Sequence, residues 1–137
     1  MLPVGYNANV KIVQGRDTIV IIQEMTHNTR VIPLVPTPKL GDAFRHWSGE
    51  SRGWWEGDTL VVDSRGFNED FWFTNGGLPH TEQLRMIERF TRENLDTLRY
   101  EVTIDDPGAY TRPWKSSWTL RWVADEELPK HMCQDNR

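Results

Sequence analysis

The stretch "LRMIERFTRENLDTLRYEVTID", residues 84–105, decides the fold because it holds two alternating segments on either side of a short turn. Apolar side chains recur at every second position in both segments, and this period of two is typical of half-buried β-strands. The three residues Glu-Asn-Leu between them are short enough to join the strands as a hairpin. One face of this hairpin is therefore predicted to line the interior, with residues Leu84, Met86, Glu88, Phe90, Leu98, Tyr100, Val102 and Ile104 on it.

The same alternation continues along the rest of the chain. About eight strands in mostly consecutive hairpins are predicted, over residues 9–14, 18–25, 30–34, 51–55, 59–65, 84–92, 96–105 and 116–125. Sequential hairpins favour an all-β, antiparallel up-and-down meander. Closing such a meander removes its unpaired edges and leaves room for one small ligand. We therefore expect a closed or nearly closed calycin- or lipocalin-like barrel, with an open, strongly curved sheet as the alternative.

Length and composition exclude several classes of protein. The 137 residues predict a single domain over 1–137, with a charged tail from about residue 126. The net charge of −4 without a basic stripe argues against nucleic acid as a partner. No apolar run reaches the ~18 residues of a membrane span. The opening "MLPVGYNANV" lacks the features of a signal peptide, so localisation stays undefined, and the lone Cys133 excludes an internal disulfide.

Glu88 stands in the middle of the predicted apolar inner face, beside the phenol of Tyr100 and the aromatic Trp118 of the last strand. A buried carboxylate must be paired or protonated, because an isolated buried charge is costly. Glu88 is therefore either an acid or base with a raised pKa or one half of a structural ion pair with an arginine. Glu24 poses the same question one hairpin earlier, with Arg30 as its expected cross-strand partner.

His80 lies in "NGGLPHTEQ", within the longest irregular segment, directly before a core strand. Long loops in compact domains are often functional. Together with Glu82, Glu88 or Asp63, His80 would form an acid/base pair that moves a proton near neutral pH. The alternative is a loop histidine bonded to backbone. Histidine and cysteine spacing shows no metal-ligand pattern, so neither a metal nor another cofactor is expected.

The two tryptophans of "RGWWEGD", Trp54 and Trp55, are adjacent, so a strand directs one inward and the other outward. We expect one to anchor the interior and the other to cover a rim, a partner or a ligand. Trp72, in the irregular segment, is a candidate lid. Exposed aromatic clusters usually mark binding or oligomer surfaces, so homodimerisation is a further expectation.

The segments "EMTHNTRVIPL", "WSGESRGWWEGDTLVVDSRGFN", "GGLPHTEQLRMIERFTR" and "YEVTIDDPGAYTRPW" resemble, in this order, an uncharacterised family of environmental and soil bacterial proteins. The resemblance covers nearly the whole chain. It implies that relatives are exported with a longer N-terminal region, and it implies a site around Asn68, Trp72, His80 and Glu82. It implies no particular reaction.

Three functions follow from these residues. The first is a metal-independent lyase, isomerase, cyclase or hydrolase that acts on a largely apolar substrate, with His80, Glu88 and Asp63 as catalytic groups. The second is a non-catalytic carrier or sensor of a small apolar or aromatic molecule, for which the ligand-binding candidates are Trp54, Trp55, Asn68, Trp72, Tyr100 and Trp118. The third is a carbohydrate-binding or interaction domain that uses its outward-facing tryptophans.

Overall fold

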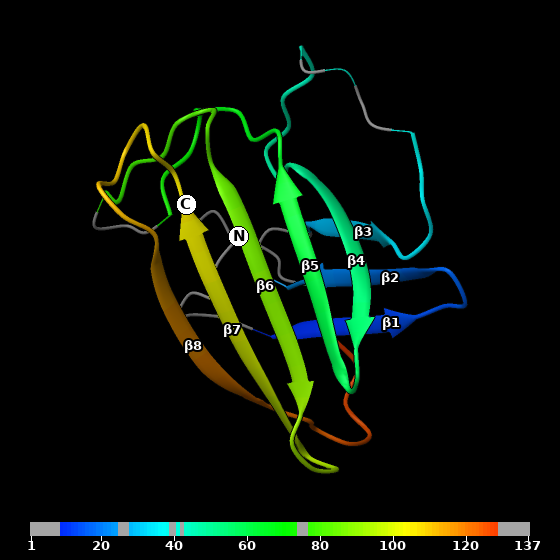
Figure 1. The fold of residues 1–137 in the computed structure, drawn as a ribbon. Coiled ribbons are helices and arrows are strands. Elements are labelled where there is room, and N and C mark those ends of the chain that lie inside the picture. Colours follow the sequence, from blue (N-terminus) through cyan, green and yellow to red (C-terminus); the bar gives the residue numbers. More distant parts are fainter. Residues whose placement is uncertain (1–8, 25–27, 39–40, 42, 74–76, 129–137) are drawn as a thin grey trace, which may run out of the picture.

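The computed structural model describes residues 9–24, 28–38, 41, 43–73 and 77–128. The described chain is all-β and contains no helix, so it includes none that could cross a membrane. His27 and Cys133 lie outside these residues. Eight strands follow one another (Figure 1): β1 Val10–Gln14, β2 Thr18–Gln23, β3 Thr29–Pro33, β4 Glu50–Glu56, β5 Thr59–Arg65, β6 Arg85–Arg92, β7 Thr97–Asp105 and β8 Trp114–Arg121.

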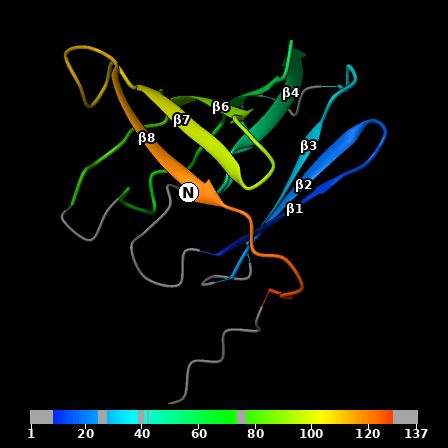
Figure 2. The same cartoon turned by 90° about the horizontal axis from the view of Figure 1, so that it is seen from below.

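The strands form two antiparallel sheets. One contains β1-β2-β3 and the other β4-β5-β6-β7-β8, and each keeps the order of the chain. The smaller sheet lies behind the larger one, and its strands run across those of the larger sheet at a steep angle (Figures 1 and 2). The predicted number of strands and their meander order are confirmed. The last strand begins two residues earlier than predicted and ends at Arg121 instead of continuing to Asp125.

No closed barrel is found among the described strands. β1 and β8 each pair on one side only, and β3 is not hydrogen-bonded to β4. The sequence explains the break after β3, because Pro33, Pro36 and Pro38 lack the amide hydrogen that a ladder needs. The meander is therefore interrupted by the proline-containing segment and resumes as a second sheet.

The turns have the chemistry that their geometry requires. Gly57 and Asp58 connect β4 to β5, and Gly57 has a φ of +59°, a conformation in which a side chain would be strained. Between β6 and β7 the Asn94 side chain accepts a hydrogen bond from the amide of Asp96 at 3.0 Å. These turns set the register that places Glu88 opposite Val62 on one side and Val102 on the other.

The core lies between the two sheets. Ile19, Ile21 and Ile32 of the smaller sheet belong to one buried cluster with the inward residues of the larger sheet, among them Leu60, Val62, Met86, Phe90, Val102 and Ile104. The sheets approach closely at Gly53, where a Cβ atom would lie 2.9 Å from side-chain atoms of Ile32 and of Leu34. Burial of these aliphatic side chains holds the sheets together.

Candidate functional site

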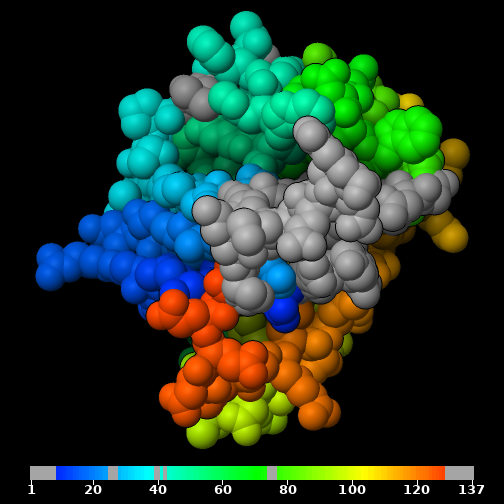
Figure 3. Space-filling view, turned by 180° about the vertical axis from the view of Figure 1, so that it is seen from behind, coloured from blue at the N-terminus to red at the C-terminus, as the bar shows by residue number. Residues whose placement is uncertain are grey.

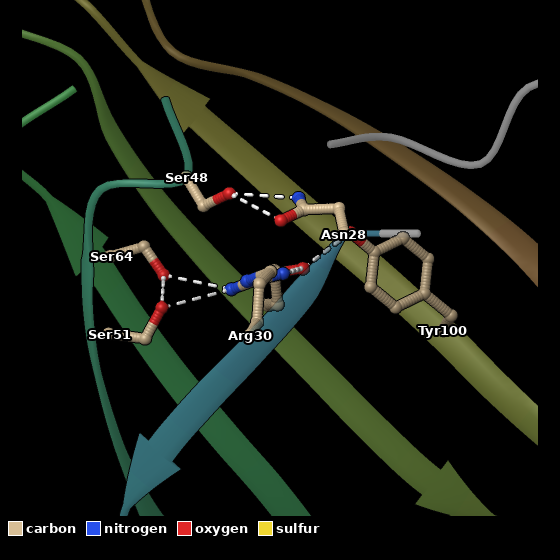
Figure 4. Close-up of polar contacts among 7 residues, drawn as sticks. Asn28, Arg30, Ser48, Ser51, Ser64 and Tyr100 are labelled. Carbon is tan, nitrogen blue, oxygen red and sulfur yellow. Dashed lines mark hydrogen bonds and ion pairs between the residues drawn. The ribbon is translucent and has the colours of Figure 1, made fainter. Parts of the chain in front are cut away.

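The centre of the core is polar. Arg30 of β3 crosses from the smaller sheet to Glu88 of β6 in a two-pronged ion pair, with Nη1 donating to Oε1 at 2.9 Å. The second guanidinium nitrogen also donates to Ser51 Oγ at 3.2 Å and to Ser64 Oγ at 3.0 Å. Tyr100 of β7 donates its hydroxyl hydrogen to Glu88 Oε1 at 2.9 Å (Figure 4). We refer to these five residues as the inter-sheet network.

The inter-sheet network keeps Glu88 ionised. Burial alone would raise the pKa of the Glu88 carboxyl, but the charge and hydrogen bonds of Arg30 and the Tyr100 hydroxyl outweigh it and lower this pKa. Burial and the neighbouring Glu88 charge raise the pKa of Tyr100, so its phenol remains protonated. Glu88 is therefore an ion-paired carboxylate and lacks the raised pKa that a proton donor would need.

The predicted ion pair of Glu88 with an arginine is thus confirmed, but the expected pairing of Arg30 with Glu24 is wrong. Glu24 instead accepts a hydrogen bond from the Asn9 side chain at 2.8 Å. Arg30 and Ile32 alternate with outward-facing residues of β3, so the guanidinium is directed between the sheets, toward Glu88.

Asp63 lies on the opposite face of the larger sheet from Glu88. Its carboxylate accepts two hydrogen bonds of 3.0 Å from Arg85 and two longer ones, of 3.4 and 3.3 Å, from Arg65. Partial burial would raise the pKa of Asp63, but these arginines lower it. The sheet therefore separates Asp63 from Glu88.

His80 lies in the segment before β6, and both of its neighbours are held by the β7–β8 connection. The buried Asp106 carboxylate accepts hydrogen bonds of 2.6 Å from the amide and from the hydroxyl of Thr81. Tyr110 donates to the carbonyl of Pro79 at 2.7 Å. At Gly108 a Cβ atom would lie 2.5 Å from Thr81 Oγ1, so this close approach requires glycine. The backbone on either side of His80 is thereby fixed.

The imidazole of His80 is buried among aromatic rings. Its centroid lies 4.1 Å from that of Phe71 and 5.3 Å from that of Phe73. Phe71 also contacts the exposed Trp47 at 6.2 Å, and Phe73 contacts Trp114 at 6.4 Å. We refer to these rings as the aromatic cluster, which comprises Trp47, Phe67, Phe71, Phe73, His80, Tyr110 and Trp114.

Two nitrogens of the aromatic cluster, His80 Nε2 and Trp114 Nε1, are buried and have no hydrogen-bond partner among the described residues. The other ring nitrogen of His80 lies 3.4 Å from the Thr81 carbonyl oxygen, a long contact. Buried polar atoms are nearly always satisfied, and an unsatisfied one costs roughly 1–3 kcal/mol. His80 thus has no carboxylate partner among the described side chains, and Glu82 next to it is exposed and lies 3.7 Å from Arg45.

The remaining site candidates are distributed over the molecule. Trp54 and Trp55 point to opposite faces of β4 as predicted, but both are exposed, by 41% and 46%, so neither anchors the interior. Trp72 is an exposed loop residue, as a lid would be. Trp118 is half-buried and stacks on Tyr100 with centroids 5.6 Å apart. Asn68 accepts a hydrogen bond from the amide of Asp70 at 3.3 Å.

Sequence reasoning missed several residues of these sites. The sequence suggests only a local partner, Glu24, for Arg30, and the serines of the inter-sheet network carry no signal in it. Phe71 and Phe73 lie in the segment that is predicted to be irregular, although their spacing of two in "EDFWFTN" places both on one side of an extended chain. That spacing was the available sign of an aromatic wall beside His80.

Two open depressions lie at the end of the molecule where β4 meets β5 and β6 meets β7. One, of about 650 Å³, is lined by Asn94, Leu95, Asp96, Thr97, Arg121 and Trp122. The other, of about 480 Å³, is lined by Trp55, Gly57, Asp58, Arg92 and Asn94. Within the described part of the chain no group of three histidine, cysteine or carboxylate side chains is placed to hold a metal ion.

Comparison with known proteins supplies no relative for this chain. No family model matches it, and neither a curated protein nor a solved structure matches it significantly. The function must therefore be argued from the two buried polar sites themselves.

Proposed function

We propose that this protein is a non-catalytic binding module that holds a small aromatic or apolar molecule carrying a hydroxyl or carbonyl group. The ligand would bind in the aromatic cluster. The observation that carries the proposal is the pair of buried, unpartnered nitrogens, His80 Nε2 and Trp114 Nε1, on rings that both contact Phe73.

The chemistry of the two nitrogens defines the ligand. Trp114 Nε1 can only donate, and His80 Nε2 accepts when the proton of the neutral imidazole is on Nδ1. A hydroxyl group can satisfy either atom, and a carbonyl can accept from the indole. The surrounding rings favour a flat or apolar body, since aromatic pairs gain roughly 0.5–1.5 kcal/mol beyond the area they bury.

Access requires one side chain to move. Phe71 is half-buried and lies between the exposed Trp47 and the buried His80, with centroids 6.2 Å and 4.1 Å away. A change of the Phe71 rotamer would admit a ligand ring above the imidazole. The hydrogen bonds between Asp106 and Thr81 and between Tyr110 and Pro79 hold the backbone on both sides of His80. They would keep the imidazole in position during this change.

The separation of the titratable groups favours binding over catalysis. Glu88 is engaged by Arg30, Asp63 is on the other face of the sheet, and neither is bonded to His80. A carrier or sensor needs no acid/base pair, whereas a proton-transfer enzyme does. The proposal requires no closed barrel, so the calycin-like closure of the sheets stays a separate prediction.

The test is a binding assay with matched pairs of small molecules, each pair differing only in a hydroxyl group, such as phenol and benzene derivatives of equal size. Tryptophan fluorescence and thermal shift would report binding. We expect the hydroxylated member of a pair to bind more tightly to the wild type, and His80→Phe to reduce this preference about tenfold. Trp54→Phe, on the outer face of the sheet, is the control and should leave it unchanged. Equal binding of both members, or a preference that survives in His80→Phe and in Trp114→Phe, would overturn the proposal.

A further inference from the structure

The larger sheet extends past the smaller one at the end that carries the β4–β5 and β6–β7 turns (Figure 1). Seen from behind, the β6–β7 turn, in yellow-green, and the orange-red residues that follow β8 lie below the β1–β2 hairpin (Figure 3). The smaller sheet therefore leaves the inner face of the larger sheet uncovered at this end.

Two tryptophans continue the inward-facing series of their strands into this end. On β4 the buried Gly53 is followed two residues later by Trp55, which is 46% exposed. On β8 the half-buried Leu120 is followed by Trp122, which is 59% exposed and whose amide donates to the Asp96 carbonyl at 2.8 Å. Within the described part of the chain neither indole stacks on another ring or donates a hydrogen bond. Both therefore leave a large apolar surface open to solvent.

These tryptophans line the two open depressions at this end of the molecule. Trp55 belongs to the depression of about 480 Å³ and Trp122 to that of about 650 Å³. Asn94, in the β6–β7 turn, lines both, so the two depressions lie on either side of it. A ligand with two or more linked rings can therefore occupy both, whereas a single small ring fills only one.

The turn between the depressions is held in shape by its own hydrogen bonds. Arg92 donates to the carbonyl oxygens of Asn94 and Leu95, at 3.2 and 2.6 Å. The Asn94 side chain accepts from the Asp96 amide at 3.0 Å, and its NH2 group has no acceptor among the described residues. The surface between the tryptophans is thus preformed, which lowers the cost of binding a ligand.

The charged groups of the two depressions balance. Asp58 and Asp96 supply two carboxylates, and Arg92 and Arg121 supply two guanidinium groups. The side chains of Asp58, Asp96 and Arg121 are exposed and form no hydrogen bond or ion pair with the rest of the described chain. The site therefore offers both acceptors and donors but no net charge.

We propose that this end of the larger sheet is a second binding site, which holds a neutral oligosaccharide with one sugar ring on Trp55 and another on Trp122. A pyranose ring has a face of C–H groups that packs on an indole, and its hydroxyl groups both donate and accept hydrogen bonds. A polyanion would need an excess of cations, and a wholly apolar molecule would leave the carboxylates and guanidinium groups desolvated. The site is separate from the aromatic cluster, because Trp114 opens β8 and Trp122 follows its other end.

Calorimetric titration with cellotetraose, maltotetraose and chitotetraose tests the inference. We expect at least one of these neutral tetrasaccharides to bind, and glucose to bind at least tenfold more weakly because it reaches one tryptophan only. Trp55→Ala and Trp122→Ala should each weaken the tetrasaccharide about five- to tenfold. Trp54→Ala is the matched control, since Trp54 is the neighbouring residue on the opposite face of β4 and is similarly exposed.

Circular dichroism and thermal unfolding would establish that each variant is folded before it is compared. His80→Phe should bind the tetrasaccharide like the wild type, which separates this site from the aromatic cluster. The inference is overturned if none of the three tetrasaccharides binds at concentrations up to about 10 mM. It is also overturned if folded Trp55→Ala and Trp122→Ala both retain full affinity, or if Trp54→Ala loses as much. Tighter binding of tetragalacturonate, a polyanion of the same length, would contradict the argument from charge balance and overturn the assignment to a neutral ligand.

Discussion

The inter-sheet network and the aromatic cluster are both buried polar sites, but they differ in how completely their polar atoms are paired. Around Arg30 and Glu88 both carboxylate oxygens and both terminal guanidinium nitrogens have partners, and only Arg30 Nε has none among the described residues. In the aromatic cluster His80 Nε2 and Trp114 Nε1 both lack one. A buried polar group that forms its hydrogen bonds within the protein is accounted for by the fold. A buried polar group without a hydrogen bond points to a partner that is not part of the chain. The difference is why we assign structure to the first site and binding to the second.

The largest effect should come from breaking the ion pair on one side only. Arg30→Met leaves Glu88 buried with its charge uncompensated, which costs roughly 3–5 kcal/mol of the free energy of unfolding. Denaturant unfolding monitored by tryptophan fluorescence would measure the loss.

The double variant Arg30→Met with Glu88→Leu is the control for this prediction. It removes both charges, and Ser51 and Ser64 can still bond to each other, since their oxygens are 2.8 Å apart. It should recover most of the lost stability, because a buried ion pair replaced by apolar side chains is often neutral. If the double variant were as unstable as Arg30→Met, the network would contribute more than charge compensation.

The next effect is the pH dependence of the same pair. The pKa of Glu88 is lower in the folded protein than in the unfolded chain, where it is about 4.3. Its contribution to stability is therefore complete above that value and is lost as pH falls through the folded pKa. The difference in unfolding free energy between wild type and Glu88→Gln should be constant from pH 6 to pH 5 and should shrink below about pH 4.3. A difference that grows toward acid would show that Glu88 is protonated in the native state.

The strands and the inner face of the larger sheet could be predicted, and the partners across the core could not. The period of two placed Glu88 and Tyr100 on the same inward face, and their register brings the Tyr100 hydroxyl to Glu88. The alternation of apolar and polar side chains is a local property, so it can be recognised from residues that are adjacent in the sequence. Arg30, in contrast, is 58 residues away from Glu88. It meets Glu88 only because one sheet folds across the other, and Glu24 offered a nearer but incorrect partner.

Neither barrel closure nor the surroundings of His80 could be predicted from the sequence, and the reasons are related. Whether β8 pairs with β1 depends on how the two sheets are oriented, and an alternating strand has the same pattern at an edge as in a closed barrel. The position of His80 in a long loop marks it as a candidate. Its ring contacts, however, come from Phe71 and Phe73, and the hydrogen bonds that fix the next residue, Thr81, are accepted by Asp106. These residues lie in irregular segments, where periodicity carries little information.

A smaller effect should follow from removing one hydroxyl of the inter-sheet network. Tyr100→Phe deletes the hydrogen bond to Glu88 Oε1, to which Arg30 still donates. Because the acceptor is charged, we expect a loss of roughly 1.5–3 kcal/mol in the free energy of unfolding. The packing of the ring on Phe90, with centroids 4.9 Å apart, should be retained. A loss below about 0.5 kcal/mol would mean that the phenol is not an important donor to this carboxylate.

The smallest effect on stability should come from the matching change in the aromatic cluster. His80→Phe keeps a ring between Phe71 and Phe73 and removes the nitrogen that has no partner. No hydrogen bond is lost at Nε2, so the free energy of unfolding should change by less than about 1 kcal/mol or rise slightly. Measured beside Tyr100→Phe, which also removes one polar group from a buried ring, it separates the two sites directly. If His80→Phe were the more destabilising of the two, His80 Nε2 would be a satisfied structural group, and the aromatic cluster would lose the feature that marks it for a ligand.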